Sequence, residues 1–189
     1  MPYVIEMYFD AETDFRNRTI WEKFASIGVS FMHDSGGRPH VSLAVCEVVD
    51  IPAACQLLDR FAGATSHFSI AFSSLGMFPG AESVLFLAPK VTSELLALHA
   101  RFFSEFASVS RDCWVRYSPS HWVPHCTFAM RLESHQISRA LDICHAAGLP
   151  LVGSVCEIGL VETLPIKQLY AAPFAEALIG SRQIDAAIS

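Results

Sequence analysis

The chain has 189 residues, of which 52% are hydrophobic and 17% are charged, a composition typical of a folded globular protein and not of a disordered one. Its formal net charge is −6, from 13 Lys and Arg residues against 19 Asp and Glu residues. Proteins that hold long nucleic acids gain most of their affinity from basic residues that neutralise phosphates, so DNA and extended RNA are not expected as partners, whereas a small anionic ligand fits this charge.

The first residues of the chain do not resemble a signal peptide. They lack a basic segment followed by a long apolar run, and Glu6 and Asp10 interrupt the first apolar stretch. No stretch reaches the roughly 18 uninterrupted apolar residues of a membrane-spanning helix. We therefore expect a cytoplasmic protein that does not associate with a membrane.

The first two elements are predicted to be a strand and a helix. Tyr3 to Phe9 is apolar and rich in β-forming residues, and Asp10 can cap the helix that follows. Apolar residues of this helix fall on spacings compatible with one buried face. They are Phe15, Trp21, Phe24 and Ile27.

The remainder of the chain continues to mix helices and strands. The predicted strands cover residues 3–9, 41–49, 68–78, 83–88, 122–130, 152–161 and 167–171, and the predicted helices cover residues 11–27, 51–62, 93–107 and 134–147. A polar stretch over residues 110–120 is predicted to be a loop, and residues 176–189 form a C-terminal tail without an informative pattern. This mixture predicts an α+β fold.

The cysteines give no indication of a metal site. None of them forms a Cys-x-x-Cys pair, and most lie among apolar neighbours; they are Cys46, Cys55, Cys113, Cys126, Cys144 and Cys156. We interpret them as reduced, buried thiols and not as zinc ligands.

Two segments of the chain are similar to each other. Residues 39–45 and 124–130 share the form Pro-His-x-[Ser/Thr]-apolar-Ala-apolar, which places His40 and His125 at an offset of 85 residues. The predicted helix stops Gly63 and Gly148 share that offset, and residues 85–89 resemble residues 169–173 at an offset of 84. The repeat predicts two α+β lobes related by a pseudo-two-fold axis, with the two histidines facing each other across a cleft.

The repeated motif suits phosphodiester chemistry. Residues i and i+2 of a strand point to the same face, so His40 lies beside Ser42 and His125 beside Thr127. One neutral and one protonated imidazole can take a proton from the attacking oxygen and give one to the leaving oxygen. The two hydroxyls can donate hydrogen bonds to phosphoryl oxygens, which carry negative charge in the transition state.

A single copy of this motif would be weak evidence. Four of the eight histidines have Ser or Thr two residues later, namely His33, His40, His67 and His125. Only His40 and His125 combine a preceding proline with membership of the repeat. The other histidines are interpreted as structural or surface residues.

With both motifs considered, the sequence resembles the 2H phosphoesterase superfamily, whose best-known branch comprises the 2′-5′ RNA ligase-like (LigT-like) proteins and cyclic phosphodiesterases. The resemblance covers nearly the whole chain. The segments that carry it are residues 3–27, 38–43, 75–79, 84–89, 98–99 and 124–128.

The resemblance implies a bilobal, duplicated α+β fold in which two antiparallel sheets line a central cleft and helices pack outside. Residues 1–175 would form this single domain, with the first motif in residues 1 to about 90 and the second in residues 91–175. It also implies metal-independent hydrolysis of a 2′,3′-cyclic or related cyclic nucleotide phosphate or an RNA terminus, in RNA processing. In some members it implies reversible 2′-5′ RNA ligation as well. His40 and His125 would be the acid–base pair, Ser42 and Thr127 would bind the phosphate, and neither a metal nor another cofactor is implied.

Four further residues are candidates for phosphate contact or base stacking: Arg38, Arg131, Tyr8 and Trp122. Several relatives place a basic residue directly after the small residue of the second motif, a position that Met130 occupies here. Strand parity places Arg131 on the His125 face, although it could equally lie in solvent.

Two other functions remain open at this point. The same cleft could hold a phosphorylated ligand or an RNA end without catalysis. A metallohydrolase could use histidine and cysteine ligands, although no HxH spacing occurs and the one HxxxH spacing runs from His121 to His125. The sequence identifies neither the cyclic phosphate nor which histidine is the base. The expected partner is a small cyclic nucleotide or a short RNA terminus, and the expected state is a monomer.

Overall fold

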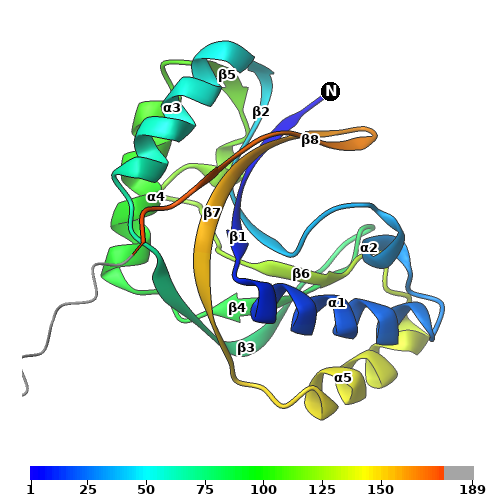
Figure 1. The fold of residues 1–189 in the computed structure, drawn as a ribbon. Coiled ribbons are helices and arrows are strands. Elements are labelled where there is room, and N and C mark those ends of the chain that lie inside the picture. The colour runs from blue at the N-terminus through cyan, green and yellow to red at the C-terminus, as the bar shows by residue number, and fades with distance from the viewer. Residues whose placement is uncertain (177–189) are drawn as a thin grey trace, which may run out of the picture.

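The computed structural model describes residues 1–176 as an α+β fold (Figure 1). The strands are β1 (Tyr3–Phe9), β2 (His40–Val49), β3 (Phe68–Phe78), β4 (Val84–Pro89), β5 (Ser110–Cys113), β6 (Cys126–Ala129), β7 (Leu151–Thr163) and β8 (Ile166–Pro173). The helices are α1 (Ala11–Ala25), α2 (Phe31–Asp34), α3 (Ile51–Gly63), α4 (Ser93–Phe106) and α5 (Ile137–Ala146), with the 3-10 turns η1 (Val115–Tyr117) and η2 (Ser134–Gln136). All of the predicted tail after residue 176 lies outside the described residues.

The eight strands form one antiparallel sheet in the order β5-β2-β1-β7-β3-β4-β6, with β8 also paired to β7. The long strand β7 joins the two ends of this sheet. Its residues 151–155 pair with β3, its residues 157–163 pair with β8, and β1 pairs along its other edge. Figure 1 shows β7 curving between these two groups of strands. The predicted antiparallel α+β fold is confirmed, but the two predicted sheets are hydrogen-bonded into one because β7 belongs to both.

Strands from the two halves of the sequence are interleaved in this sheet. β2, which begins at His40, lies between β1 and β5, whereas β6, which directly follows His125, pairs with β4 from the first half. The two motifs therefore lie towards opposite ends of the strand order. The two halves of the chain, divided near residue 90, do not correspond to two separate parts of the sheet, because β6 pairs with β4. That residues 1–175 form one domain stays a prediction.

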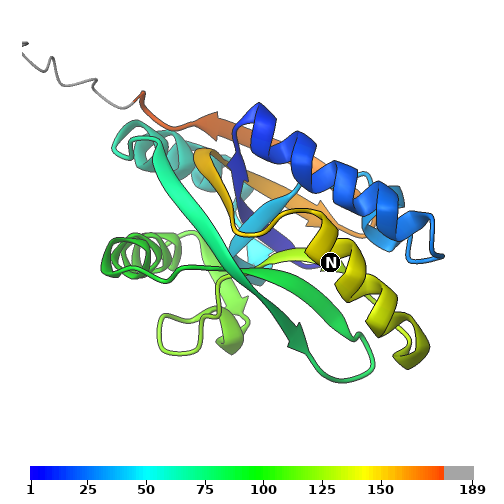
Figure 2. The same cartoon turned by 90° about the horizontal axis from the view of Figure 1, so that it is seen from below.

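The helices cover the sheet as two pairs. α3 packs against β7 and β8, and α4 packs against α3 and β2. α1 packs against β1, β6 and β7, and α5 packs against α1. Figures 1 and 2 show these pairs at different ends of the molecule. Within residues 1–176, no helix is long and apolar enough to cross a membrane.

Helix α1 confirms one prediction and corrects another. Asp10 caps the helix, since its carboxylate accepts a hydrogen bond of 2.8 Å from the backbone N–H of Thr13. Trp21 and Phe24 are buried as predicted, but Phe15 is 70% exposed. Phe15 is two positions from buried Thr13, which is about 200° around the helix and therefore on the solvent side.

Two short strands differ from the prediction. β5 lies within the predicted loop of residues 110–120, where a polar sequence without alternation pairs with the end of β2. β6 begins at Cys126 and not at residue 122, because the N–H of Trp122 bonds to the oxygen of Ser118 in a turn and Pro124 has no N–H to contribute to a strand ladder.

One pair of cysteines is oxidised. Cys46 on β2 and Cys113 on β5 are register partners and form a disulfide, so the prediction of six reduced thiols is wrong for these two. The four free cysteines are Cys55, Cys126, Cys144 and Cys156. Because β5 was predicted to be a loop, the sequence did not reveal that this pair, 67 residues apart, is adjacent.

Candidate active site

His40 and His125 hold their imidazole rings in the same way. Nδ1 of His40 lies 2.6 Å from the backbone oxygen of Arg38, and Nδ1 of His125 lies 2.7 Å from the backbone oxygen of Val123. A carbonyl oxygen only accepts hydrogen bonds, so Nδ1–H is the donor in each ring and Nε2 is left to take up or release a proton. The same bond to the carbonyl two residues earlier thus accompanies both copies of the sequence repeat.

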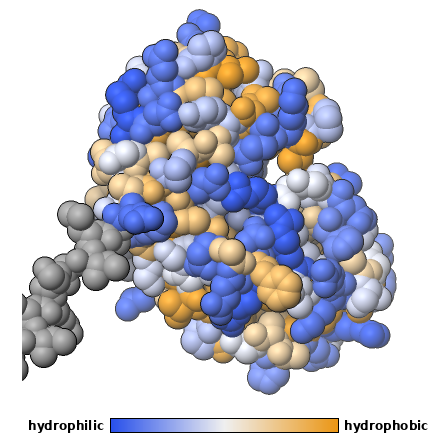
Figure 3. Space-filling model, in the orientation of Figure 1, coloured by the Kyte–Doolittle hydropathy of each residue, from blue (hydrophilic) through white to orange (hydrophobic). Residues whose placement is uncertain are grey.

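The two rings lie close enough for their charges to interact. Burial lowers the pKa of His125 below its ordinary value, the positive charges of His40 and Arg116 lower it further, and only the bond to Val123 opposes this. The surface is hollowed between the β8 end and the α1–α2 end of the molecule, and hydrophilic residues gather there (Figure 3). Because burial and the two positive charges lower its pKa, His125 is expected to be neutral near neutral pH.

An aromatic wall surrounds His125. The ring of Phe78 on β3 packs against it edge-on, with centroids 5.0 Å apart, and the ring of Phe86 on β4 lies at 5.3 Å. The two phenyl rings also contact each other at 4.3 Å. These apolar neighbours supply much of the burial that disfavours a charged imidazole.

A polar wall surrounds His40. Tyr8 and Glu6 on β1 are the register partners of His40 and Ser42, so all four side chains share one face of the sheet. Oε1 of Glu6 lies 3.4 Å from Nε2 of His40, and the hydroxyl of Tyr8 donates to the other oxygen of Glu6 at 2.9 Å. Burial, followed by the charge of Glu6, raises the pKa of Tyr8, so the phenol keeps its proton.

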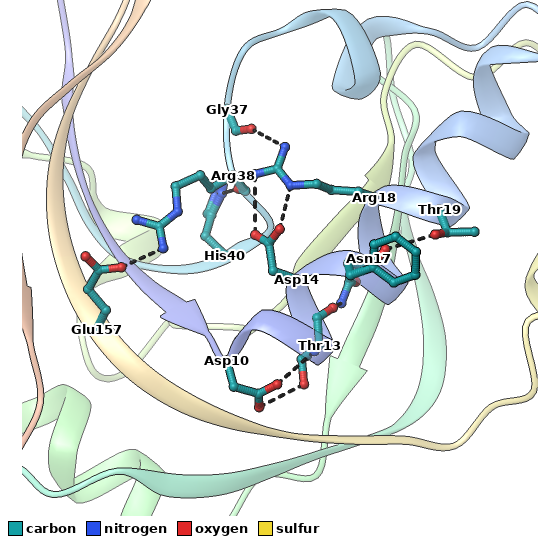
Figure 4. A network of polar contacts seen from close by, with 11 residues as sticks. Asp10, Thr13, Asp14, Asn17, Arg18, Thr19, Gly37, Arg38, His40 and Glu157 are labelled. Carbon is teal, nitrogen blue, oxygen red and sulfur yellow. Dashed lines mark hydrogen bonds and ion pairs between the residues drawn. The ribbon is translucent and has the colours of Figure 1, made fainter. Parts of the chain in front are cut away.

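Arg38 and Tyr8, both predicted as ligand contacts, form a layer beside His40. The guanidinium of Arg38 lies 3.8 Å from the centroid of the Tyr8 ring, and its Nη2 bonds to the carboxylate of Glu157 on β7 at 2.5 Å (Figure 4). Arg38 is therefore near the site as predicted, but much of its charge is already compensated.

The loop that carries Arg38 is fixed to α1. Arg18 pairs with Asp14 at 2.5 Å on the same helix, and its Nη1 donates to the backbone oxygen of Gly37 at 3.4 Å (Figure 4). The residue after Gly37 is Arg38, whose backbone oxygen accepts the hydrogen bond that orients the His40 ring. Helix α1 thereby helps to set the orientation of the first histidine.

Ser42 and Trp122 are more deeply buried than their predicted roles suggested. Ser42 shares the face of His40 and is buried, with the Tyr117 side chain beside it. Trp122 is 7% exposed, stacks on His99 at 3.9 Å, and donates its indole N–H to the backbone oxygen of Ser42 at 2.9 Å. Trp122 was predicted to contact a ligand, but the structure places it behind β2 as a support, since the turn before β6 folds it inward.

Thr127 lies on the same side of its segment as His125. Residues 125 and 127 are partly exposed, whereas residues 126 and 128 are buried, as strand parity predicts. The backbone oxygen of Thr127 accepts a hydrogen bond of 3.1 Å from the indole of Trp21, so α1 also supports the second motif.

Arg131 does not join the two histidines. β6 ends at Ala129, and Arg131 has a left-handed backbone with φ of 59°, so strand parity does not extend to it. Its side chain is 63% exposed and contacts Glu82 and the ring of Phe31. It lines a cavity of about 570 Å³ between α2, the end of β6 and the β7–β8 hairpin, and neither histidine lines that cavity.

Comparison with known proteins decides the family. The family model of the 2′-5′ RNA ligase superfamily matches residues 31–165, which include both histidine motifs. The chain belongs to the 2′-5′ RNA ligase superfamily. This confirms the resemblance to 2H phosphoesterases and places the chain among enzymes that process phosphodiesters. No curated protein matches the chain.

Several solved structures have a similar fold. The protein TT0787 of Thermus thermophilus has a TM-score of 0.58 at 15% identity, with 93% of this chain and 99% of that chain covered. E. coli LigT in its apo form has a TM-score of 0.52 at 17% identity, covering 93% and 98%. A further phosphoesterase has a TM-score of 0.53 at 16% identity, covering 92% and 98%. At these identities the likeness establishes the fold.

For this superfamily member, sequence reasoning missed several residues around the histidines. They are Glu6, Phe78, Phe86, Arg116, Tyr117 and Glu157. Glu6 gave a signal, because it is a lone carboxylate in an apolar strand and lies two residues from Tyr8. Phe78, Phe86 and Glu157 become neighbours through strand pairing, and Arg116 and Tyr117 through the packing of η1 against β2. In the described chain, residues 1–176, no three His, Cys, Asp or Glu side chains come together as metal ligands.

Proposed function

We propose that this protein hydrolyses a 2′,3′-cyclic or related cyclic nucleotide phosphate, or a short RNA terminus with such a group, by metal-independent acid–base catalysis with His40 and His125. The observation that carries the proposal is the matched orientation of the two rings. Each Nδ1 is occupied by a carbonyl oxygen two residues earlier, which leaves the two Nε2 atoms for proton transfer.

The proposed reaction needs one proton to enter and one to leave. A neutral histidine takes a proton from water as the water oxygen attacks phosphorus, and the protonated histidine gives a proton to the ribose oxygen as its bond to phosphorus breaks. Ser42 and Thr127 lie on the faces of the two histidines and would donate hydrogen bonds to the non-bridging oxygens. The same steps with the 5′-hydroxyl of a second ribose in place of water would form a 2′-5′ linkage, because the 5′ oxygen bonds to phosphorus as the bond to the 3′ oxygen breaks.

The charges around the site favour a substrate with few phosphates. Glu6 and Glu157 both lie on the polar wall, and Glu157 already pairs with Arg38. Two carboxylates beside the reacting centre would repel a polyanion more than a single phosphodiester. E. coli LigT, which shares the fold, has been crystallised with 3′-AMP and phosphate and also with ATP and NADP+, which carry three phosphates each. These ligands support a small nucleotide as the substrate but not a low number of phosphates.

The test is hydrolysis of the four 2′,3′-cyclic nucleotide monophosphates in excess EDTA. We expect turnover, and a loss of about 10²–10⁴-fold in kcat/KM for His40→Ala and for His125→Ala. His67→Ala is the matched control, because His67 also precedes an x-Ser-apolar-Ala sequence but stands outside the repeat, and it should retain activity. Full activity in both motif variants would refute the mechanism, and nucleotide binding without turnover would indicate a non-catalytic binding module.

A further inference from the structure

His40 and His125 occupy equivalent positions in the sequence repeat, but their rings contact different groups. Nε2 of His40 faces the carboxylate of Glu6 at 3.4 Å, and the side chain of Glu6 is only 9% exposed. His125 has no such carboxylate among its described contacts, and instead packs against Phe78 and Phe86. The first ring therefore has an anionic partner, and the second has an apolar one.

The Glu6 carboxylate is held in place from its own strand. The hydroxyl of Tyr8 donates to Oε2 of Glu6 at 2.9 Å, so the opposite oxygen is the one that faces His40. Tyr8 is in turn covered by the guanidinium of Arg38. A buried carboxylate fixed in this way stabilises a proton on the imidazole that it faces.

We propose that Glu6 is a positioning residue that keeps a proton on His40, so that His40 is the general acid and His125 the general base. This assignment rests on the proposed function above. His125 Nε2 takes a proton from the attacking water as the new P–O bond forms, and His40 Nε2–H gives its proton to the ribose oxygen as the old P–O bond breaks. Exchange with solvent then restores a neutral His125 and a protonated His40.

Several other titratable or charged groups face this pair and enter the balance. Those that interact with Glu6 or His40 are Tyr8 on β1, Arg38 before β2, Tyr117 on η1, and His125 and Cys126 at the start of β6. Arg116 and Asp14 act at one remove, through the charge of Arg116 on His125 and that of Asp14 on Cys126. Burial raises the pKa of Glu6, and the charge of His40, the Tyr8 hydroxyl and Arg38 oppose that rise. The charge of His40 therefore acts directly on the Glu6 carboxylate.

The decisive experiment is the pH profile of kcat/KM for Glu6→Gln. A neutral amide keeps the shape of the side chain but removes the charge that stabilises the protonated ring. The alkaline limb, which reports loss of the acid's proton, should move down by about one pH unit, while the acidic limb of His125 stays in place. Glu6→Asp keeps the charge and should recover part of the shift.

Glu162→Gln is the matched control for charge. It removes a carboxylate from the same sheet, but one that lies opposite Tyr3 at the other end of β7, so both limbs should stay in place. Thermal unfolding of each variant separates a folding defect from a change in titration. A shift of the acidic limb in Glu6→Gln, or no shift of either limb in a folded variant, would overturn the assignment.

A second readout does not depend on turnover. NMR titration of the His40 ring protons in the free protein should show a lower midpoint in Glu6→Gln than in the wild type, and the His125 midpoint should be unchanged. If the wild type hydrolyses no cyclic phosphate but this shift is seen, the proposed function fails while the Glu6–His40 coupling stands. An unchanged His40 midpoint overturns the role of Glu6 whatever the activity.

Discussion

Gly76 offers a direct test of how the aromatic wall positions His125. Gly76 on β3 is the register partner of Phe86 on β4, and the Phe86 ring lies across it. A Cβ added at Gly76 would overlap Cζ and Cε2 of Phe86 and lie 3.2 Å from Cε1. Phe86 is buried and contacts both Phe78 and His125, so its ring cannot move without displacing one of them.

The expected cost of Gly76→Ala follows from this overlap. Forcing a methyl group into a packed site typically costs about 1–3 kcal/mol, and reduced freedom of the unfolded chain returns about 0.4–1 kcal/mol. We expect a net destabilisation of about 1–2 kcal/mol. For a chain of this size, each kcal/mol of lost unfolding free energy lowers Tm by about 2–4 °C. A displaced His125 should also lower kcat/KM by about 10- to 100-fold.

Urea denaturation and the cyclic phosphate assay measure the two effects. Gly63→Ala is the control, because a Cβ at Gly63 meets nothing within 4 Å and the variant should be as stable as the wild type or slightly more so. Replacing Phe86 by Leu in the Gly76→Ala background should relieve the overlap, so the two changes should not be additive. If Gly76→Ala is as stable as Gly63→Ala, the reasoning about the wall is refuted.

Two further predictions concern the supports of the site. The indole N–H of Trp122 is the only side-chain donor described for the buried backbone oxygen of Ser42. Trp122→Phe removes it and should lower the free energy of unfolding, measured by urea denaturation, by about 1–2 kcal/mol. The control Trp114→Phe loses a bond to the exposed carboxylate of Glu47 and should lower it by about 0.5 kcal/mol or less. Arg116→Gln removes a cation that lowers the pKa of His125; because neutral His125 acts as base, the acidic limb of kcat/KM should move to higher pH, and an unmoved limb would show that Arg116 has no influence there.

Much of the fold could be predicted because its longer elements carry a clear period. The strand at residues 3–9, the cap at Asp10 and the helix at residues 93–107 all match the structure closely. β5 could not be predicted, because Ser110–Cys113 is polar, short and held only by its pairing with β2. The disulfide was missed for the same reason. The sequence predicts a helix or strand only where the element is long enough to show a period of apolar residues, and the four residues of β5 are too few.

The site was predictable to the extent that it is repeated. The matching motifs predict His40 and His125 as the candidate pair, and the same bond at each Nδ1 shows that the repeat is also one of local structure. Arg131 lies away from the histidines because strand parity does not extend beyond the end of β6, and Trp122 lies in a turn although a strand was predicted to begin there. Parity holds only while the backbone stays extended, and it fails at a left-handed residue or a turn.

What the repeat could not reveal is the difference between its two copies. A strand contributes its own side chains, but the groups beside them come from whichever strand pairs with it. β2 pairs with β1, which brings Glu6 to Ser42 and Tyr8 to His40, whereas β6 pairs with β4, which brings Phe86 to Thr127. Because a symmetric pair of motifs lies in an asymmetric order of strands, one imidazole meets a carboxylate and the other meets phenyl rings. Such a difference would fix which imidazole holds the proton, whereas two equivalent histidines could exchange the two roles.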